Sequence, residues 1–217
     1  DTIVGPAGGD TIIGLGGNDT ITGTGDANVY VYYFGDGNDT ISDYGHWNTV
    51  DRLIFPDLNA NDVSFANQSN DDMTITMSNG EVITIIDQVR NAYYSIEEVA
   101  FADGTVLNIQ GIRDKAVADM KSIGAVIGTD WVENYTHALG DGSYTVSDYG
   151  HWNNVDRLIL TDQLQTDVTI THLSNDDMVL TLSNGETITV IDQSRSGYYG
   201  IEEIEYSDGT VVVRANF

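Results

Sequence analysis

The sequence contains no cysteine, two prolines and only eight basic residues among its 217 residues. The lack of cysteine excludes disulfides, thiolate metal ligands and cysteine nucleophiles, so the fold needs another source of stability. Eight basic residues against 34 acidic ones give a net charge of −26, which excludes nucleic acid as a partner. No run of about 18 apolar residues and no signal segment is present, so we expect no membrane span. Because the chain starts inside a repeat pattern, we expect a monomeric part of a longer protein.

Glycine is abundant in this sequence, whereas proline is scarce. The 23 glycines are typical of many positive-φ turns between short extended segments, so we predict mostly β structure. Hydrophobic residues make up 41% of the chain, which is enough for a core at this length. The surplus carboxylates either repel one another or bind cations, and calcium prefers such oxygen ligands. A merely acidic surface is the alternative explanation.

The chain contains a tandem duplication. Residues 43–107 match residues 148–212 at 39 of 65 positions without a gap. We therefore divide the chain into a first module at 1–110, a linker helix at 111–123 and a partly degenerate second module at 124–217. A site found in one module should be sought in the other.

A shorter period occupies the N-terminal stretch. From Gly5 the chain reads GPAGGDTII, GLGGNDTIT and GTGDANVYV, and FGDGNDTIS follows at Phe34–Ser42. Each unit has glycines, then Asp or Asn at its sixth place, then an apolar residue at its eighth. A turn followed by a three-residue strand, when repeated, stacks into a parallel coil with two units per turn. The loops then alternate between the two edges of a flattened roll.

These loops can bind cations. Glycine lets backbone carbonyls point at one centre, and Asp adds a carboxylate oxygen to the same centre. The spacing stacks the loop of Asp10 on that of Asn28, and the loop of Asp19 on that of Asp39. Without an ion, these oxygens would lie unpaired a few ångströms apart, so folding should depend on Ca²⁺. The candidate ligands in the first module are Asp10, Asp19, Asp26, Asn28, Asp36, Asp39 and Asp43.

The second module matches this pattern less well. It keeps Asp130, Asp141 and Asp148 as candidate calcium ligands, but Tyr144 stands where the first module has Asp39. We therefore predict fewer or weaker calcium ions in the second module.

The nonapeptides resemble the repeats-in-toxin (RTX), or haemolysin-type calcium-binding, family, whose repeat is G-G-x-G-x-D-x-U-x with U a large apolar residue. The longer module, from GDGNDTISDYG through SIEEVAFADGT, is similar to the haemolysin-type calcium-binding related domain. The resemblance implies a parallel β-roll with several Ca²⁺ ions between loops, type I export in an unfolded state and folding on extracellular calcium. Pro6, Leu15 and Thr24 depart from the glycine of the repeat's second position.

The rest of each module indicates antiparallel strands. Apolar and polar residues alternate over Met73–Met77, and Asn79–Gly80 forms a hairpin turn into Glu81–Ile86. The second module repeats this pattern. Further strands are expected at 50–55, 95–101 and 105–108. Between the modules, apolar residues recur every four positions over Gly111–Ser122, which predicts the linker helix. The predicted fold is all-β: a parallel β-roll of nonapeptides followed by antiparallel capping sheets, duplicated in tandem, with one short linker helix.

One repeated loop offers an alternative function. Aromatic residues beside polar ones can stack on a sugar ring and bind its hydroxyl groups, and a duplicated site would give avidity for an extracellular polysaccharide or cell-surface glycan. Packing between the roll and its cap is the competing interpretation. The residues are Tyr44, His46, Trp47, Tyr149, His151 and Trp152.

Catalytic patterns are missing from the sequence. The acid pairs Glu97–Glu98 and Glu202–Glu203 point to opposite faces of a strand, so neither pair can flank one glycosidic bond. No Ser-His-Asp order, phosphate loop or HExxH helix is present. We therefore predict a non-catalytic calcium-binding module of a large secreted bacterial protein, with a calcium-dependent glycan-binding or adhesin module as the alternative.

Overall fold

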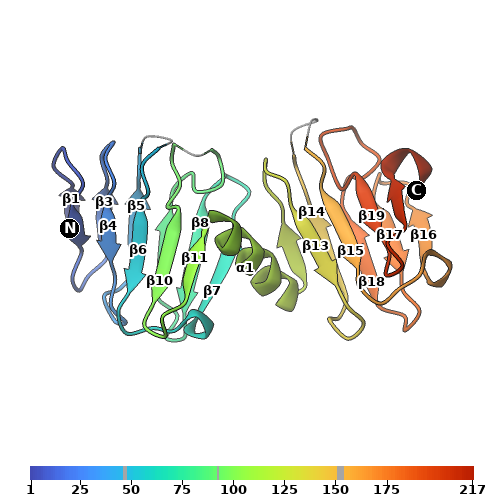
Figure 1. Ribbon diagram of the computed structural model, residues 1–217, viewed down its shortest axis with the longest axis horizontal. Helices are drawn as coiled ribbons and strands as arrows, with labels where there is room; N and C mark the ends of the chain where they lie inside the picture. Colours follow the sequence, from blue (N-terminus) through green and yellow to red (C-terminus); the bar gives the residue numbers. More distant parts are fainter. Residues whose placement is uncertain (46–47, 92, 151–153) are drawn as a thin grey trace. The chain divides into compact units, whose positions relative to one another are not determined.

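The computed structural model describes residues 1–45, 48–91, 93–150 and 154–217 (Figure 1). The chain forms two compact units, Asp1–Ala116 and Val117–Phe217. The boundary between them falls within the α-helix α1, Ile109–Ser122. Within the described residues, no helix is both long and apolar enough to cross a membrane.

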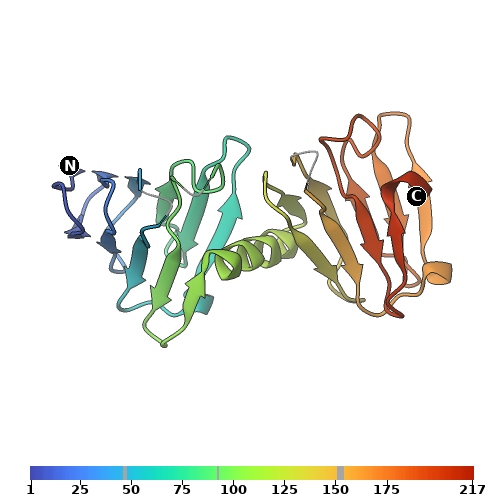
Figure 2. The ribbon, with the colours of Figure 1, turned by 45° about the horizontal axis from the view of Figure 1, so that its top comes forward.

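Unit 1 consists of two sheets that face one another as separate layers (Figure 2). The first sheet has the order β1 (Thr2–Val4), β3 (Thr20–Thr22), β5 (Asp39–Ser42), β9 (Val82–Ile85), β8 (Met73–Met77) and β7 (Val63–Asn67). The second has the order β11 (Val106–Asn108), β10 (Glu98–Phe101), β6 (Arg52–Phe55), β4 (Val29–Val31) and β2 (Thr11–Ile13). A 3₁₀ helix, Ala60–Asp62, precedes β7.

The nonapeptides form the predicted parallel roll. Strands β1, β3 and β5 pair in parallel in one sheet, and β2, β4 and β6 pair in parallel in the other. Two nonapeptides therefore complete one turn of the coil. The apolar eighth positions point inward, because Ile12, Ile21, Tyr30 and Ile41 are all buried. Burial of these four apolar side chains stabilises the short strands.

The strands that follow the nonapeptides extend both sheets of the roll. The expected antiparallel strands are present as β7–β8–β9 and β10–β11. In addition, β9 pairs in parallel with β5, and β10 pairs in parallel with β6. Alternation of apolar residues predicts a strand but not the direction of its partner, so this parallel continuation was not expected. The sequence also did not reveal β7 as a separate strand.

Unit 2 repeats this architecture over a shorter roll. Its first sheet has the order β12 (Ala125–Ile127), β14 (Tyr144–Ser147), β18 (Thr187–Val190), β17 (Met178–Thr181) and β16 (Thr169–His172). Its second has the order β13 (Asn134–His137), β15 (Arg157–Leu160), β19 (Glu203–Glu205) and β20 (Val211–Val213). The 3₁₀ helices Gln165–Asp167 and Arg214–Asn216 complete the unit. The hairpin turns of the two units match, because Gly80 and Gly185 both have φ of 88°.

Helix α1 begins two residues before the range predicted from its apolar period. The residues of its predicted stripe, Ile112, Ala116 and Met120, are all buried. Within unit 1, the ammonium of Lys115 lies 5.5 Å from the ring centre of Phe65 in β7. The four-residue period therefore identified the buried face of the helix correctly.

Candidate metal centres

Three polar side chains meet at one edge of the roll in unit 1. Asn28 directly precedes β4, Asp51 directly precedes β6, and Asp43 directly follows β5. Because β4 and β6 pair in parallel with Val29 opposite Arg52, Asn28 and Asp51 stack on one another. All three side chains are buried, with exposed fractions of 0% for Asn28 and 1% for each Asp. The coil thus gathers residues that are distant in the sequence into one buried polar centre.

Backbone amides hold these carboxylates in place. The amide of Asn28 donates to Oδ1 of Asp51 at 2.6 Å, and the amide of Asp51 donates to Oε2 of Glu97 at 2.7 Å. The hydroxyl of Tyr30 donates to Oδ2 of Asp43 at 2.8 Å. Each acid at the start of a strand therefore accepts a hydrogen bond from the equivalent residue of the preceding coil.

Unit 2 builds the same centre from Glu133, Asp148 and Asp156, which are all buried. One carboxylate oxygen from each lies within 4.8 Å of the others. The amide of Glu133 donates to Oδ1 of Asp156 at 2.7 Å, and the amide of Asp156 donates to Oε2 of Glu202 at 2.9 Å. A hydroxyl group, Thr129 Oγ1, donates to Oε1 of Glu133. The two amide-to-carboxylate bonds of unit 2 thus repeat those of unit 1.

Glycines leave room for these carboxylates. A Cβ at Gly45 would lie 2.8 Å from Oδ2 of Asp51, and a Cβ at Gly150 would lie 3.1 Å from Oδ2 of Asp156. A Cβ at Gly128 would overlap both Asp148 and the hydroxyl of Tyr135. Each centre is therefore lined on one side by backbone that carries no side chain.

Burial strongly favours the protonated form of these acids. Burial, followed by the charge of Asp51, raises the pKa of Asp43 to about 7. In unit 2, burial, followed by the charges of Asp156 and Glu133, raises the pKa of Asp148 well above its usual range. Burial also raises the pKa of Asp156 to about 6. Carboxylates that lie this close together and are buried away from solvent must either hold protons or share a cation.

The donor set fits calcium. Within the described part of the chain, hydrogen-bond partners are missing for Oδ1 of Asn28, for Oδ1 of Asp43 and for both carboxylate oxygens of Asp148. Calcium takes oxygen ligands at about 2.3–2.6 Å, so two ligands on opposite sides of the ion lie about 4.8 Å apart. One oxygen from each of the three unit 2 carboxylates lies within that distance of the others. The buried oxygens without partners thus have the chemistry and spacing that a calcium ion requires.

The opposite edge of unit 1 carries a second acid pair. The amide of Asp19 donates to Oδ1 of Asp39 at 2.9 Å, and both residues are buried. One carboxylate oxygen of Asp19, Oδ1, lies 2.6 Å from the N-terminal ammonium of Asp1, whereas Oδ2 has no hydrogen-bond partner among the described residues. In unit 2, Tyr144 replaces Asp39 and packs against His137 with ring centres 5.7 Å apart. This edge of unit 2 therefore has an aromatic pair in place of the acid pair.

The structure does not bring the other expected ligands into these centres. Asp10 is partly exposed, Asp26 and Asp130 are exposed, and the carboxylate of Asp36 accepts a hydrogen bond from the amide of Tyr33 in its own turn. The carboxylate of Asp141 lies 2.7 Å from the ammonium of Lys121. The centres thus contain four of the expected acids, Asp19, Asp39, Asp43 and Asp148, together with the amide Asn28.

Sequence reasoning missed several members of the centres. Asp51 and Asp156 occupy equivalent places in the repeated motif VDRLI, and the same 105-residue offset places Glu133 opposite Asn28. Alignment of the two modules could have revealed these residues. Asp51 and Asp156 are the same acid in both modules, and Glu133 is an acid in place of Asn28. The two acids of the first pair have different partners: Glu97 accepts from the amide of Asp51, whereas Glu98 pairs with Arg52.

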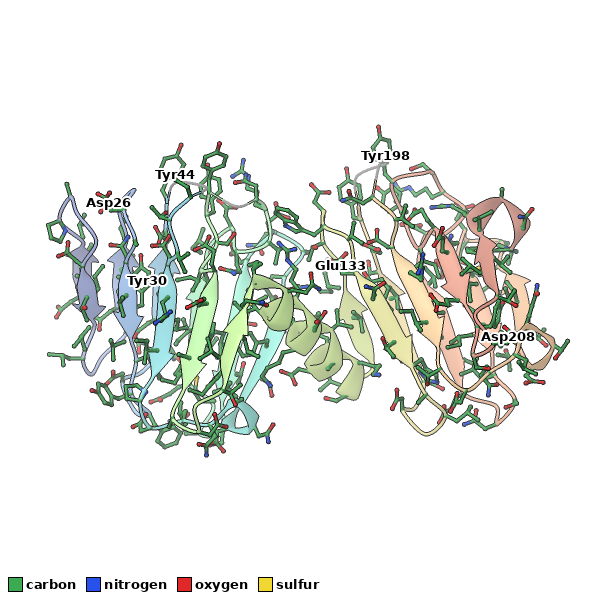
Figure 3. All side chains as sticks on the ribbon, viewed as in Figure 1. Asp26, Tyr30, Tyr44, Glu133, Tyr198 and Asp208 are labelled. Atoms are coloured by element: carbon green, nitrogen blue, oxygen red, sulfur yellow. The ribbon has the colours of Figure 1, made fainter. Side chains whose placement is uncertain are left out.

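The repeated aromatic loops lie beside the centres. Tyr44 and Tyr149 are 60% and 59% exposed. Each packs against a second tyrosine, Tyr94 in unit 1 and Tyr199 in unit 2, with ring centres 5.3 and 5.1 Å apart. In Figure 3, Tyr44 stands out from the loop that follows β5. The other candidate glycan ligands, His46, Trp47, His151 and Trp152, lie outside the described residues.

One protein-family model matches a segment of each unit. Residues 72–110 and 177–215 each match the family model of the haemolysin-type calcium binding protein related domain. Both segments are thus similar to this domain, which confirms the resemblance predicted for the longer module. The comparison with curated proteins gives no significant match.

Among solved structures, the chain is similar to the extracellular lipase LipA from Serratia marcescens, with 15% identity and a TM-score of 0.22. The match covers 84% of this chain and 38% of the lipase. A TM-score of this size does not establish a common fold.

Proposed function

We propose that this chain is a non-catalytic calcium-binding module of a larger secreted protein, and that calcium completes its fold. The carrying observation is the pair of buried carboxylate centres, in which Oδ1 of Asn28, Oδ1 of Asp43 and both oxygens of Asp148 lack hydrogen-bond partners among the described residues. Several kcal/mol are needed to bury such a group without compensation. A bound cation supplies that compensation, and the two domains related to haemolysin-type calcium-binding proteins support calcium as the ion.

The proposed ligands divide by edge of the roll. At the first edge, Asn28, Asp43 and Asp51 bind one ion in unit 1, and Glu133, Asp148 and Asp156 bind one ion in unit 2. At the opposite edge of unit 1, Asp19 and Asp39 bind a further ion. The loop acids Asp10, Asp26 and Asp36 lie in the stacked loops but outside these centres. In unit 2, Asp141 is not among the proposed ligands, because its carboxylate pairs with Lys121.

Calcium-dependent folding suits a secreted protein. Extracellular calcium sites commonly have dissociation constants of about 10⁻⁴–10⁻³ M, so they fill only where calcium is abundant. The chain would then remain unfolded and exportable inside the cell and would fold outside it. The resemblance of the nonapeptides to the RTX repeat supports type I export.

A calcium titration of the whole chain tests this proposal. We expect a cooperative thermal melt and a β-sheet circular dichroism signal that strengthen with calcium and weaken with a chelator, while magnesium has little effect. Magnesium is the matched control because it binds oxygen ligands but demands a smaller octahedral site. A chain that melts identically in chelator and in calcium would refute the proposal.

The aromatic loops favour glycan binding as a second candidate function. In both units an arginine lies over the second tyrosine of the pair. The guanidinium carbon of Arg90 lies 5.3 Å from the ring centre of Tyr94, and that of Arg195 lies 4.8 Å from the ring centre of Tyr199. The duplication thus preserves a partly exposed aromatic surface, of a kind that stacks on sugar rings.

Co-sedimentation with insoluble polysaccharides, such as cellulose and chitin, tests the glycan candidate. We expect the double variant Tyr44→Ala, Tyr149→Ala to lose binding while its thermal melt in calcium stays unchanged. Equal binding by the variant and the parent chain would exclude the tyrosines as the contact, and failure of the parent chain to bind any tested polysaccharide would exclude this function for them.

A further inference from the structure

We propose that the two first-edge centres differ in calcium affinity and fill in a fixed order, with the centre of unit 2 filling before the centre of unit 1. This inference rests on the proposed calcium-binding function and adds to it. It also reverses the order expected from the nonapeptide pattern, which is weaker in unit 2. The reversal arises from one residue that the duplication did not preserve.

The two centres are otherwise built from the same residues. The 105-residue offset superposes Asp43 on Asp148 and Asp51 on Asp156. Three further kinds of residue are shared: the acid behind the centre, the core tyrosine and the two lining glycines. These pairs are Glu97 and Glu202, Tyr30 and Tyr135, Gly23 and Gly128, and Gly45 and Gly150. The remaining position holds Asn28 in unit 1 and Glu133 in unit 2.

Asn28 gives unit 1 a neutral ligand. Its side-chain amide donates to the carbonyls of Thr24 at 2.8 Å and Asp26 at 2.7 Å. These two bonds consume the donors of the amide and leave Oδ1 without a partner among the described residues. Asp43 and Asp51 therefore supply the negative charge of this centre, which has two carboxylates.

Glu133 gives unit 2 a third carboxylate in the equivalent position. One of its oxygens lies within 4.8 Å of one oxygen each of Asp148 and Asp156, so the three carboxylates converge. Ligand charge is one of the two properties that set the affinity of calcium sites, together with rigidity. Three convergent carboxylates attract a divalent cation more strongly than two carboxylates and an amide do.

Asp148 has a second reason to bind an ion strongly. In unit 1, the hydroxyl of Tyr30 satisfies one oxygen of Asp43 at 2.8 Å. In unit 2, the hydroxyl of Tyr135 and both oxygens of Asp148 are buried without a hydrogen bond of standard geometry among the described residues. Asp148 is 1% exposed, so its oxygens are shielded from bulk water. More of the unit 2 centre is therefore available for calcium, and more of its stability depends on it.

Calorimetric titration of the full chain with calcium tests the order, with two isosteric changes made separately. Glu133→Gln removes a charge from unit 2, and Asn28→Asp adds one to unit 1. We expect two classes of first-edge sites in the parent chain, with dissociation constants that differ roughly tenfold. Glu133→Gln should weaken the tighter class about tenfold and leave the weaker class in place. Asn28→Asp should tighten the weaker class.

Asp130→Asn is the matched control. It removes the same charge from the same unit, but Asp130 is exposed and lies outside the centre. If this control weakens the tighter class as much as Glu133→Gln does, net charge rather than coordination sets the order, and the inference fails. Glu133→Asp restores the carboxylate and should recover most of the affinity that Glu133→Gln loses.

The possible results separate this inference from the function on which it rests. A parent chain that binds no calcium would refute the proposed function. Calcium binding with a single affinity, or with a tighter class that responds to Asn28→Asp and not to Glu133→Gln, would refute the order and leave the function standing. If Glu133→Gln does not fold in calcium, the change in the weaker class caused by Asn28→Asp still decides the question.

Discussion

The space beside Gly128 gives the sharpest test of the unit 2 centre. A Cβ added at this position would overlap the hydroxyl of Tyr135 and Oδ1 of Asp148, and it would lie 2.7 Å from Cγ of Asp148. Both side chains are buried, so neither can turn away into solvent. Overpacking of this kind costs about 1–3 kcal/mol. For a unit of this size, about 2 kcal/mol corresponds to a fall in Tm of roughly 8–16 °C.

The same change should remove the calcium response of unit 2. A ligand present at 100 times its dissociation constant stabilises the folded state by about 2.7 kcal/mol, which corresponds to roughly 10 °C or more. Gly128→Ala displaces Asp148, and so the increase in Tm on adding calcium should shrink by about that amount. Thermal melts followed by circular dichroism, in chelator and in calcium, measure both effects.

Gly197→Ala is the control for this prediction. Gly197 belongs to the same unit, has no heavy atom within 4 Å of an added Cβ, and is not among the glycines with positive φ. We expect this variant to melt like the parent chain in both conditions. If Gly128→Ala melts like Gly197→Ala and gains as much from calcium, the described packing around Asp148 is wrong.

Three further predictions concern unit 1. Gly37→Ala should destabilise the roll by about 1–3 kcal/mol in a denaturant titration, because its Cβ would overlap the carbonyl of Gly17, whereas Gly16→Ala, with open space around it, should be neutral. Tyr30→Phe should cost about 1.5–3 kcal/mol in chelator, because Asp43 loses the hydrogen bond at 2.8 Å; an unchanged unfolding midpoint would contradict that bond. Since the pKa of Asp43 is raised to about 7 in the folded state, its protonated form stabilises the chain below about pH 4, and that stability is lost as the pH rises toward 7. Melts in chelator should therefore weaken across this window, and added calcium should abolish the decline; a flat profile in chelator would count against it.

Several features of the fold follow from the sequence because they depend on local periodicity. The nine-residue repeat places a turn before every three-residue strand, and this alone predicts strand stacking and the burial of Ile12, Ile21, Tyr30 and Ile41. The four-residue stripe of α1 likewise predicts its buried face. These patterns work because the side-chain direction of a strand or a helix is set by its own backbone geometry.

The centres could be predicted only in part. Asp43 was recognisable because it follows a nonapeptide, whereas Asp51 lies beyond the last repeat and inside the strand expected at 50–55. Its place beside Asn28 depends on the parallel pairing of β4 with β6, which joins residues 23 positions apart. Nothing in the local sequence fixes that pairing, so this contact could not be derived from periodicity.

The sequence by itself determined the duplicated, all-β, acidic roll and its likeness to calcium-binding proteins, because composition and period are properties of the chain. Only the tertiary structure decided which acids share a centre. It buried Glu133 beside Asp148 and Asp156, left Asp26 and Asp130 exposed, and paired Asp141 with Lys121. The physical reason is that the charge of a carboxylate can be tolerated in water anywhere on the surface, whereas a buried cluster of carboxylates exists only where coils close on one another and a cation or proton balances them.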